Sequence, residues 1–126
     1  MYQATQAPDD QRDIIQSLGI AGDVDGIEQI AKSAADPKVR STAIRSLGIF
    51  GGKAAGPKLA QIYTTAPDAE AKKAAAEAMF INGDSADLVA LARKEADPTM
   101  KRVLVEKLSL MGDKAARDYM MEILNH

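Results

Sequence analysis

Four stretches of this chain repeat one another, and this repetition limits the possible folds more than any other feature of the sequence. The closing glycine of each stretch recurs at spacings of 29, 32 and 29 residues, at Gly22, Gly51, Gly83 and Gly112. The stretches begin at the same spacings, at Ala7, Asp36, Asp68 and Asp97. A period of this length predicts tandem units that stack, because no single unit can bury its apolar face alone.

Each repeated stretch has the two ends of an α-helix. Asp36-Pro37 and Asp97-Pro98 place a capping carboxylate before a proline, whose missing N–H costs nothing in the first helical turn. The closing glycine suits the left-handed residue that ends many helices. Shorter apolar segments lie between the stretches and at the end of the chain. We therefore predict eight helices of about 8 to 13 residues, and no strands, because no segment alternates with a period of two.

The stretch DPKVRSTAIRSLG, from Asp36, resembles the D-P-x-V-R-x-x-A-x-x-x-L-G pattern of HEAT repeats. The closest variety is the short bacterial type that also occurs in phycobilin lyases. The resemblance is strong in the second repeat, good in the fourth and weaker in the other two. It implies an all-α, right-handed solenoid of four helix pairs, with the first helix of each pair on the concave face. The expected domain spans 7–126, with repeats at about 7–35, 36–66, 67–96 and 97–126, after a flexible tail at 1–6.

The expected core follows from helical spacing. Counted from zero at the start of each repeat, positions 3, 7, 11 and 14 share one helical face. They hold apolar residues in the last three repeats: Val39, Ala43, Leu47 and Phe50, then Ala71, Ala75 and Met79, then Met100, Leu104, Leu108 and Met111. Position 8 is also apolar throughout, at Ile15, Ile44, Ala76 and Val105. Several of the 23 alanines, such as Ala43, Ala71, Ala75 and Ala76, stand at these positions, where small side chains let helices pack closely.

Positions 5, 9 and 12 lie opposite the core and form the candidate binding surface. Glycines aside, its residues are Arg12, Gln16, Ser41, Arg45, Lys73, Glu77, Phe80, Arg102, Glu106 and Ser109. One interpretation is a shallow groove of mixed charge with Phe80 as an anchor for a partner. The alternative is an ordinary solvated helix face, on which Glu77 and Glu106 each follow a cation by four residues. Phe80 could equally pack against the next repeat.

A basic residue occupies position 4 in three repeats, as Arg40, Lys72 and Lys101. In HEAT-like proteins such a residue often pairs with an acidic residue of the preceding turn. Glu95 is placed to pair with Lys101, whereas Ala34 occupies the corresponding place before Arg40. We therefore expect an incomplete structural ladder of charge pairs.

The two ends of the predicted array differ. Asp10 and Asp13 in the first helix stand where other repeats are mostly apolar, as suits an end helix that faces solvent. The last helix, in contrast, carries Tyr119, Met120, Met121, Ile123 and Leu124 on more than one face. The interpretations are a solenoid that continues further, an end that packs on another chain through self-association, or a broad core face filled by methionine.

Composition disfavours most catalytic functions. The chain has no cysteine, and its single histidine is His126 at the end of the sequence. Gly52-Lys53 lacks both the leading glycine and the following hydroxyl residue of a phosphate loop. The carboxylates sit mostly at helix caps, without a pair placed for acid–base catalysis. We predict no enzyme activity and no catalytic, cofactor-binding or metal-binding residues.

A net charge of −2 disfavours a nucleic-acid surface, and no apolar run is long enough to cross a membrane. The beginning of the sequence lacks the pattern of a signal peptide, which favours a soluble, cytoplasmic protein. The favoured function is a non-catalytic scaffold that binds another protein or a peptide segment through its concave face or an end face. The alternatives are an enzyme-associated unit of the bilin lyase type, although three Tyr and two Phe are few to hold a tetrapyrrole, and a weak nucleic-acid-binding module.

Overall fold

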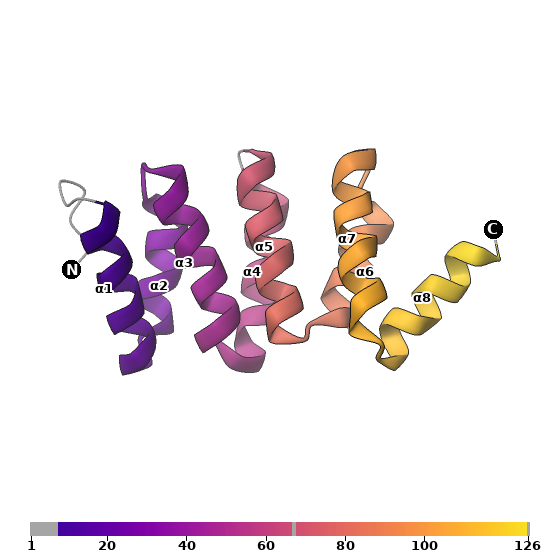
Figure 1. Cartoon of the computed structure of the whole chain (residues 1–126), viewed down its shortest axis with the longest axis horizontal. Coiled ribbons are helices and arrows are strands. Elements are labelled where there is room, and N and C mark those ends of the chain that lie inside the picture. Colours follow the sequence, from indigo (N-terminus) through magenta and orange to yellow (C-terminus); the bar gives the residue numbers. More distant parts are fainter. Residues whose placement is uncertain (1–7, 67, 126) are drawn as a thin grey trace.

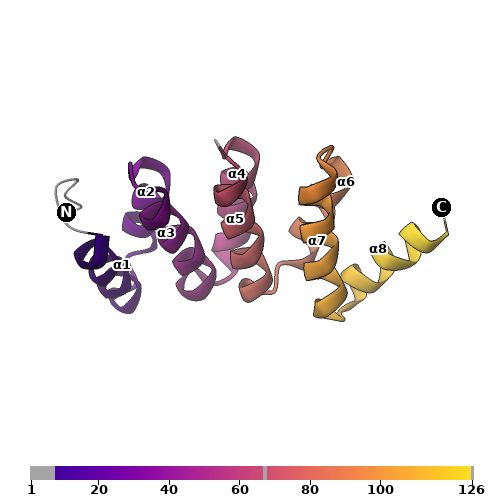
Figure 2. The same ribbon diagram turned by 45° about the horizontal axis from the view of Figure 1, so that its top comes forward.

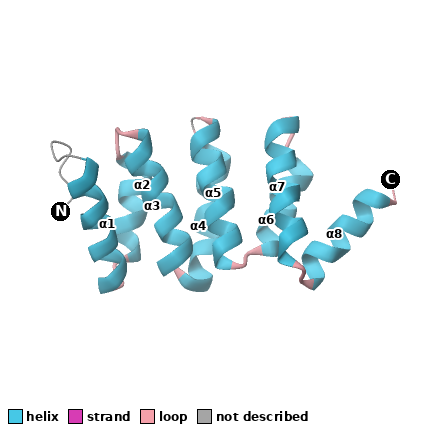
Figure 3. Cartoon of the chain, viewed as in Figure 1, coloured by secondary structure: helices cyan, strands magenta, loops and turns pink. Residues whose placement is uncertain are grey.

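The computed structural model describes residues 8–66 and 68–125, with the side chains of residues 8–10 left out. Within them the chain forms eight α-helices and one 3-10 turn, and no strand (Figure 3). The elements are α1 (Pro8–Ala21), α2 (Val24–Ser33), α3 (Pro37–Phe50), η1 (Gly52–Ala54), α4 (Ala55–Thr65), α5 (Ala69–Asn82), α6 (Ser85–Lys94), α7 (Pro98–Met111) and α8 (Lys114–Leu124). The all-helical prediction is confirmed. The predicted tail at 1–6 lies outside the described residues.

The helices form an elongated row with α1 at one end and α8 at the other (Figure 1). The odd-numbered helices α1, α3, α5 and α7 run side by side in one layer, and α2, α4 and α6 lie behind them. Turning the molecule keeps this order, with α8 leaning away from α7 at the far end (Figure 2). This is the expected α-solenoid. The hand of its superhelix and the exact limits of its repeats stay predictions.

Aspartates begin most of the helices, as predicted. The carboxylate of Asp36 accepts a hydrogen bond from the Lys38 amide at 2.8 Å, and that of Asp97 accepts one from the Thr99 amide at 3.1 Å. Asp68 caps α5 in the same way through the Ala71 amide at 2.8 Å. Each of these bonds satisfies an amide that has no partner within its own helix.

Glycines with positive φ end three of the odd-numbered helices, at Gly22, Gly83 and Gly112. Gly51 differs, because its φ is −81°, and Gly52 takes the left-handed conformation instead. The longer linker of the second repeat therefore continues into the 3-10 turn η1 before α4 begins.

The core lies between the two layers and follows the predicted periodicity at positions 3, 7 and 11. Val39, Leu47, Met79, Leu104 and Leu108 are all buried. Position 14 departs from the prediction, because Phe50 is exposed and Met111 is only half-buried. This position lies in the last turn of the helix, next to the linker, where the neighbouring helices no longer cover it.

Each even-numbered helix packs more extensively on the odd-numbered helix that follows it than on the one before it. The tight pairs are α2 with α3, α4 with α5, and α6 with α7. Odd-numbered helices also pack directly on one another, most closely α3 on α5. The small side chains of α5 make this possible, because Ala71, Ala74, Ala75, Ala76 and Ala78 are all buried.

Candidate protein-binding face

The outer surface of α1, α3, α5 and α7, here called the odd-helix face, carries most of the predicted binding residues. Arg12, Gln16, Lys73, Arg102, Glu106 and Ser109 are exposed there, and Arg45, Glu77 and Phe80 are half-exposed. Ser41 was expected on this surface, but the structure buries it, because only 2% of the residue is exposed. It lies on α3, whose packing against α5 is the closest in the molecule, and so it is not available to a partner.

Charges on this face are partly paired across helices. Arg45 of α3 lies 3.3 Å from a carboxylate oxygen of Glu77 in α5, and both side chains are partly exposed. Glu77 thus has a cation on the neighbouring helix, besides Lys73 four residues earlier in its own helix. An exposed pair of this kind contributes at most about 1 kcal/mol, and its main effect is to neutralise the middle of the face.

Phe80 of α5 turns toward the following repeat. The ammonium group of Lys107 in α7 lies 5.5 Å from the centre of its ring, within the range of a cation–π contact. The ring is half-buried by this arrangement. Of the two interpretations of Phe80, packing against the next repeat describes its position, and a part of the ring remains on the surface.

The most prominent apolar feature of the odd-helix face was not predicted. Position 13 of every repeat holds an exposed branched aliphatic residue, between 47% and 75% exposed in the four helices. These residues, here called the aliphatic stripe, are Ile20, Ile49, Ile81 and Leu110. Position 13 lies beside position 9 on the outer side of a helix, since residues four apart share a face.

The sequence contained a signal for the stripe. An aliphatic residue stands two residues before the closing glycine in every repeat, outside the four positions that form the core face. A large apolar residue kept off the core in all four units is a candidate for binding, because single exposed apolar residues need no explanation but contiguous ones do.

The basic residues at position 4 join each repeat to the following one. Arg40 lies 3.6 Å from Asp68, and Lys72 lies 3.9 Å from Glu95. The predicted pair of Glu95 with Lys101 is therefore wrong. The nearly buried Glu95 carboxylate accepts hydrogen bonds from the Tyr63 hydroxyl and the Asp97 amide, which turns it away from Lys101.

The comparison of sequences agrees with this arrangement of two stacked helical layers. A sequence model of the family described as HEAT repeats matches residues 2–79 of the chain. The chain belongs to the HEAT-repeat family. Comparison with curated proteins and with solved structures gave no significant match.

The family match covers α1 to α5, including the second repeat, in which the resemblance was strongest. HEAT repeats are helical scaffolds that often serve protein interaction, and the family is generally non-catalytic. Within the described part of this HEAT-repeat protein, no three acidic or histidine side chains gather to hold a metal ion. None of its described helices combines the length and apolarity needed to cross a membrane.

Four carboxylates of the described structure have perturbed pKa values, and two of them, Asp84 and Glu95, lie at the two ends of α6. Burial raises the pKa of Asp84, and the nearby charge of Asp87 adds to this effect. A hydrogen bond from Tyr63 lowers the pKa of Glu95, and burial followed by the Glu95 contact raises the pKa of the Tyr63 phenol. Both groups sit at junctions between helices, Asp84 before α6 and Glu95 after it, so they belong to the scaffold.

Proposed function

We propose that this HEAT-repeat protein is a non-catalytic scaffold that binds another protein across its odd-helix face. The observation that supports this proposal is the aliphatic stripe, one exposed aliphatic residue at the same place in all four repeats. Repeat solenoids offer extended surfaces rather than deep pockets, which suits the binding of a segment of a partner protein.

The spacing of the stripe residues indicates how far apart the apolar side chains of the partner lie. Axes of packed helices lie about 8–10 Å apart, so successive stripe residues present apolar contacts at intervals of that order. A partner segment in the polyproline II conformation covers the same distance in about three residues and presents every third side chain on one face. We expect a partner with apolar side chains at roughly that spacing, flanked by polar residues that meet Arg102 and Glu106 on the adjacent surface.

The charge distribution favours a protein partner over a nucleic acid. Glu77 neutralises Arg45 in the middle of the odd-helix face, and Glu106 lies on the same face between Arg102 and Ser109. A nucleic-acid surface needs uninterrupted cations along the path of the phosphates. The sequence of charges on these four helices interrupts such a path.

The test compares a stripe variant with a matched variant of the even-helix layer. The variant Ile49→Asp/Ile81→Asp places two carboxylates in the stripe, and Ala90→Asp adds one at an exposed site on α6. The three proteins are immobilised and incubated with lysate of the source cell, and the retained proteins are quantified by mass spectrometry. We expect a partner that wild type and Ala90→Asp retain and that Ile49→Asp/Ile81→Asp loses at least about tenfold. Equal retention by all three proteins would remove the stripe from the binding site.

A further inference from the structure

Within the described residues, α1 and α8 stand at the two ends of the row, and each has other repeats on one side only. In the interior, each even-numbered helix is covered by the odd-numbered helix that follows it. Among the described residues, no odd-numbered helix follows α8 and no even-numbered helix precedes α1. The missing partner of α8 is therefore a helix of the α1 type, and the missing partner of α1 is a helix of the α8 type.

Equivalent residues of the even-numbered helices show what α8 leaves open. Three of these helices, α2, α6 and α8, directly follow an aspartate. The eighth residue after that aspartate is Ala31 in α2, Ala92 in α6 and Met121 in α8. Ala31 is 5% exposed and Ala92 is 0% exposed, whereas Met121 is 56% exposed. The eleventh residue behaves alike, because Ala34 is buried and Leu124 is one of the most exposed aliphatic residues of the molecule.

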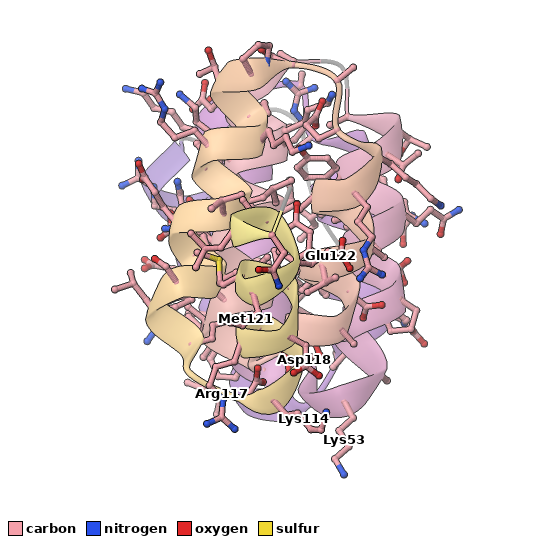
Figure 4. All side chains as sticks on the ribbon, turned by 90° about the vertical axis from the view of Figure 1, so that its right-hand side faces the viewer. Lys53, Lys114, Arg117, Asp118, Met121 and Glu122 are labelled. Atoms are coloured by element: carbon pink, nitrogen blue, oxygen red, sulfur yellow. The ribbon has the colours of Figure 1, made fainter. Side chains whose placement is uncertain are left out.

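Figure 4 faces this end of the molecule and shows α8 in front, with Arg117 and Met121 labelled on it. Beside α8 lies a groove of about 660 Å³, bordered by α7 and the end of α6. Val105 in this groove is half-exposed, although its equivalents Ile44 and Ala76 are buried by the next odd-numbered helix. The groove is the place that a further odd-numbered helix would fill.

The α1 end of the row also has apolar residues that the neighbouring helices cover only in part. Positions 7 and 11 of α1 are Ile14 and Leu18, which are half-buried, whereas Leu47, Met79 and Leu108 at position 11 of the later helices are completely covered. Ile14 and Leu18 border a groove of about 460 Å³ that also runs along α2. An even-numbered helix laid against α1 would cover these two residues, as α2 covers the core face of α3.

The two ends also differ in charge, although the α7–α8 groove is mixed: its lining holds the pair of Arg93 with Glu122, and Lys101 and Arg102 beside Glu106. Lys101 and Arg102 are exposed beside the groove on α7 and make no ion pair among the described residues, and Arg117 is exposed on α8. The sequence of α1 contains three aspartates and one arginine, and Asp13 is exposed there without an ion pair in the described structure. Lys101 has the same position in its repeat as Arg40, which joins α3 to the beginning of α5 through Asp68.

We propose that copies of this chain associate head to tail, with α1 of one copy packed on α7 and α8 of the next. The contact would repeat the interior arrangement of the solenoid, because α8 of one copy and α1 of another would form the same kind of pair as α2 with α3. It uses the end surfaces, including Arg102 and Glu106 at the end of the odd-helix face, and it leaves the stripe residues Ile49 and Ile81 of the interior helices free. Such a heterologous contact uses different surfaces on the two copies, and each added copy leaves one end of each kind open for the next.

Two variants that each block one end provide the test. Met121→Asp places a carboxylate on the exposed face of α8, where it would repel the aspartates of α1, and Asp13→Arg places a large cation opposite Lys101 and Arg102. Both sites are exposed, and far-UV circular dichroism with thermal melting checks that the variants fold as wild type does. Gln61→Arg, on the exposed side of α4, is the matched control. Molar mass is measured by sedimentation equilibrium up to about 1 mM, which detects a Kd in the millimolar range.

We expect the mean mass of wild type and Gln61→Arg to rise continuously with concentration. Each blocking variant should associate at least about tenfold more weakly, and added salt should weaken wild-type association. An equimolar mixture of Met121→Asp and Asp13→Arg should stop at twice the 13.4 kDa of one chain, since only one intact pair of ends remains in it.

Three results would overturn the proposal. The first is a wild-type mass of one chain at every concentration. The second is a wild-type dimer that Asp13→Arg leaves unchanged, because that result indicates a symmetric contact of α8 with α8. The third is a mixture of the two blocked variants that stays monomeric while wild type associates.

Discussion

Gly48 of α3 lies directly against the backbone of Ala78 in α5. A Cβ atom built on Gly48 would come within 2.4 Å of the Ala78 carbonyl oxygen and 2.7 Å of its Cα. No side chain fits in that space, and the atoms it would meet belong to a helix backbone that cannot rotate away. The closest contact between two repeats therefore depends on glycine at this position, with alanines along the facing side of α5.

The first prediction is that Gly48→Ala destabilises the protein by about 1–3 kcal/mol, because two packed helices must separate to admit the methyl group. Gly19→Ala is its matched control. The three atoms nearest to an added Cβ of Gly19 all belong to the ring of Phe50, a side chain that is 37% exposed, and none of them is backbone. There the gain in helix propensity, up to about 1 kcal/mol, should offset the crowding. Urea denaturation of both variants measures the difference, and equal stabilities would contradict the role assigned to the Ala78 backbone.

The second prediction concerns the link between α4 and the loop after α6. Tyr63→Phe removes the hydroxyl that donates to Glu95 and leaves that nearly buried carboxylate with a weaker set of partners. We expect a loss of about 1–3 kcal/mol at neutral pH. Tyr119→Phe is the control, since Tyr119 is also buried but its hydroxyl donates no hydrogen bond in the described structure. A smaller loss is expected for Tyr119→Phe in the same thermal melts.

The pH dependence of this effect has a definite sign. The pKa of Glu95 is lowered in the folded protein, first by the Tyr63 hydrogen bond, so its contribution is present above the unfolded pKa. That contribution is lost as the pH falls through the folded pKa. The difference in stability between wild type and Tyr63→Phe should therefore shrink in acid. A difference that grows in acid would show that Glu95 is not the group responsible.

Most of the fold could be predicted from the sequence, because the same local features of helix capping, helix ends and burial recur in four repeats. Capping by Asp36 and Asp97, helix ends at the glycines and burial at Leu47 or Leu108 each depend on a few neighbouring residues. Local rules of this kind can be read from periodicity alone.

The candidate site was harder to predict, because it depends on contacts between repeats. The spacing of residues within one repeat gives no information about these contacts. Ser41 looked like a surface residue by helical periodicity, yet the close approach of α5 buries it. Glu95 looked available to Lys101 by distance in the sequence, but Tyr63 from the preceding helix pair holds it. The stripe residue Ile81 was overlooked because the sequence alone does not say which of several apolar positions the neighbouring helix covers.

The third prediction contrasts two capping aspartates. The carboxylate of Asp84 makes no capping hydrogen bond, one of its oxygens is buried without a partner, and its pKa is raised by burial. A raised folded pKa means that the charged form destabilises the native state at neutral pH, and that this cost disappears as the pH falls through the folded pKa. Asp84→Asn should therefore raise the melting temperature at pH 7, with a smaller gain in acid.

Asp113→Asn should have the opposite effect. The Asp113 carboxylate accepts hydrogen bonds from the Ser85 hydroxyl and the Ala116 amide, and the Ser85 contact is the main cause of its lowered pKa. Removing its charge should lower the melting temperature at pH 7, and the loss should fade as the pH falls through the pKa of the folded wild type. Thermal melts of the two variants at neutral and acid pH check both signs. Shifts in the same direction at pH 7 would contradict this account.

The fourth prediction separates the structural role of Phe80 from a role in binding. Phe80→Leu keeps an apolar side chain on the odd-helix face but removes the ring over which Lys107 lies. A double-mutant cycle with Lys107→Met should give a coupling of about 0.5–1 kcal/mol, as expected for an exposed cation–π contact. If the aliphatic stripe is the binding surface, Phe80→Leu should retain the partner that Ile49→Asp/Ile81→Asp loses. Loss of that partner by Phe80→Leu with unchanged stability would instead place the ring itself in the interface.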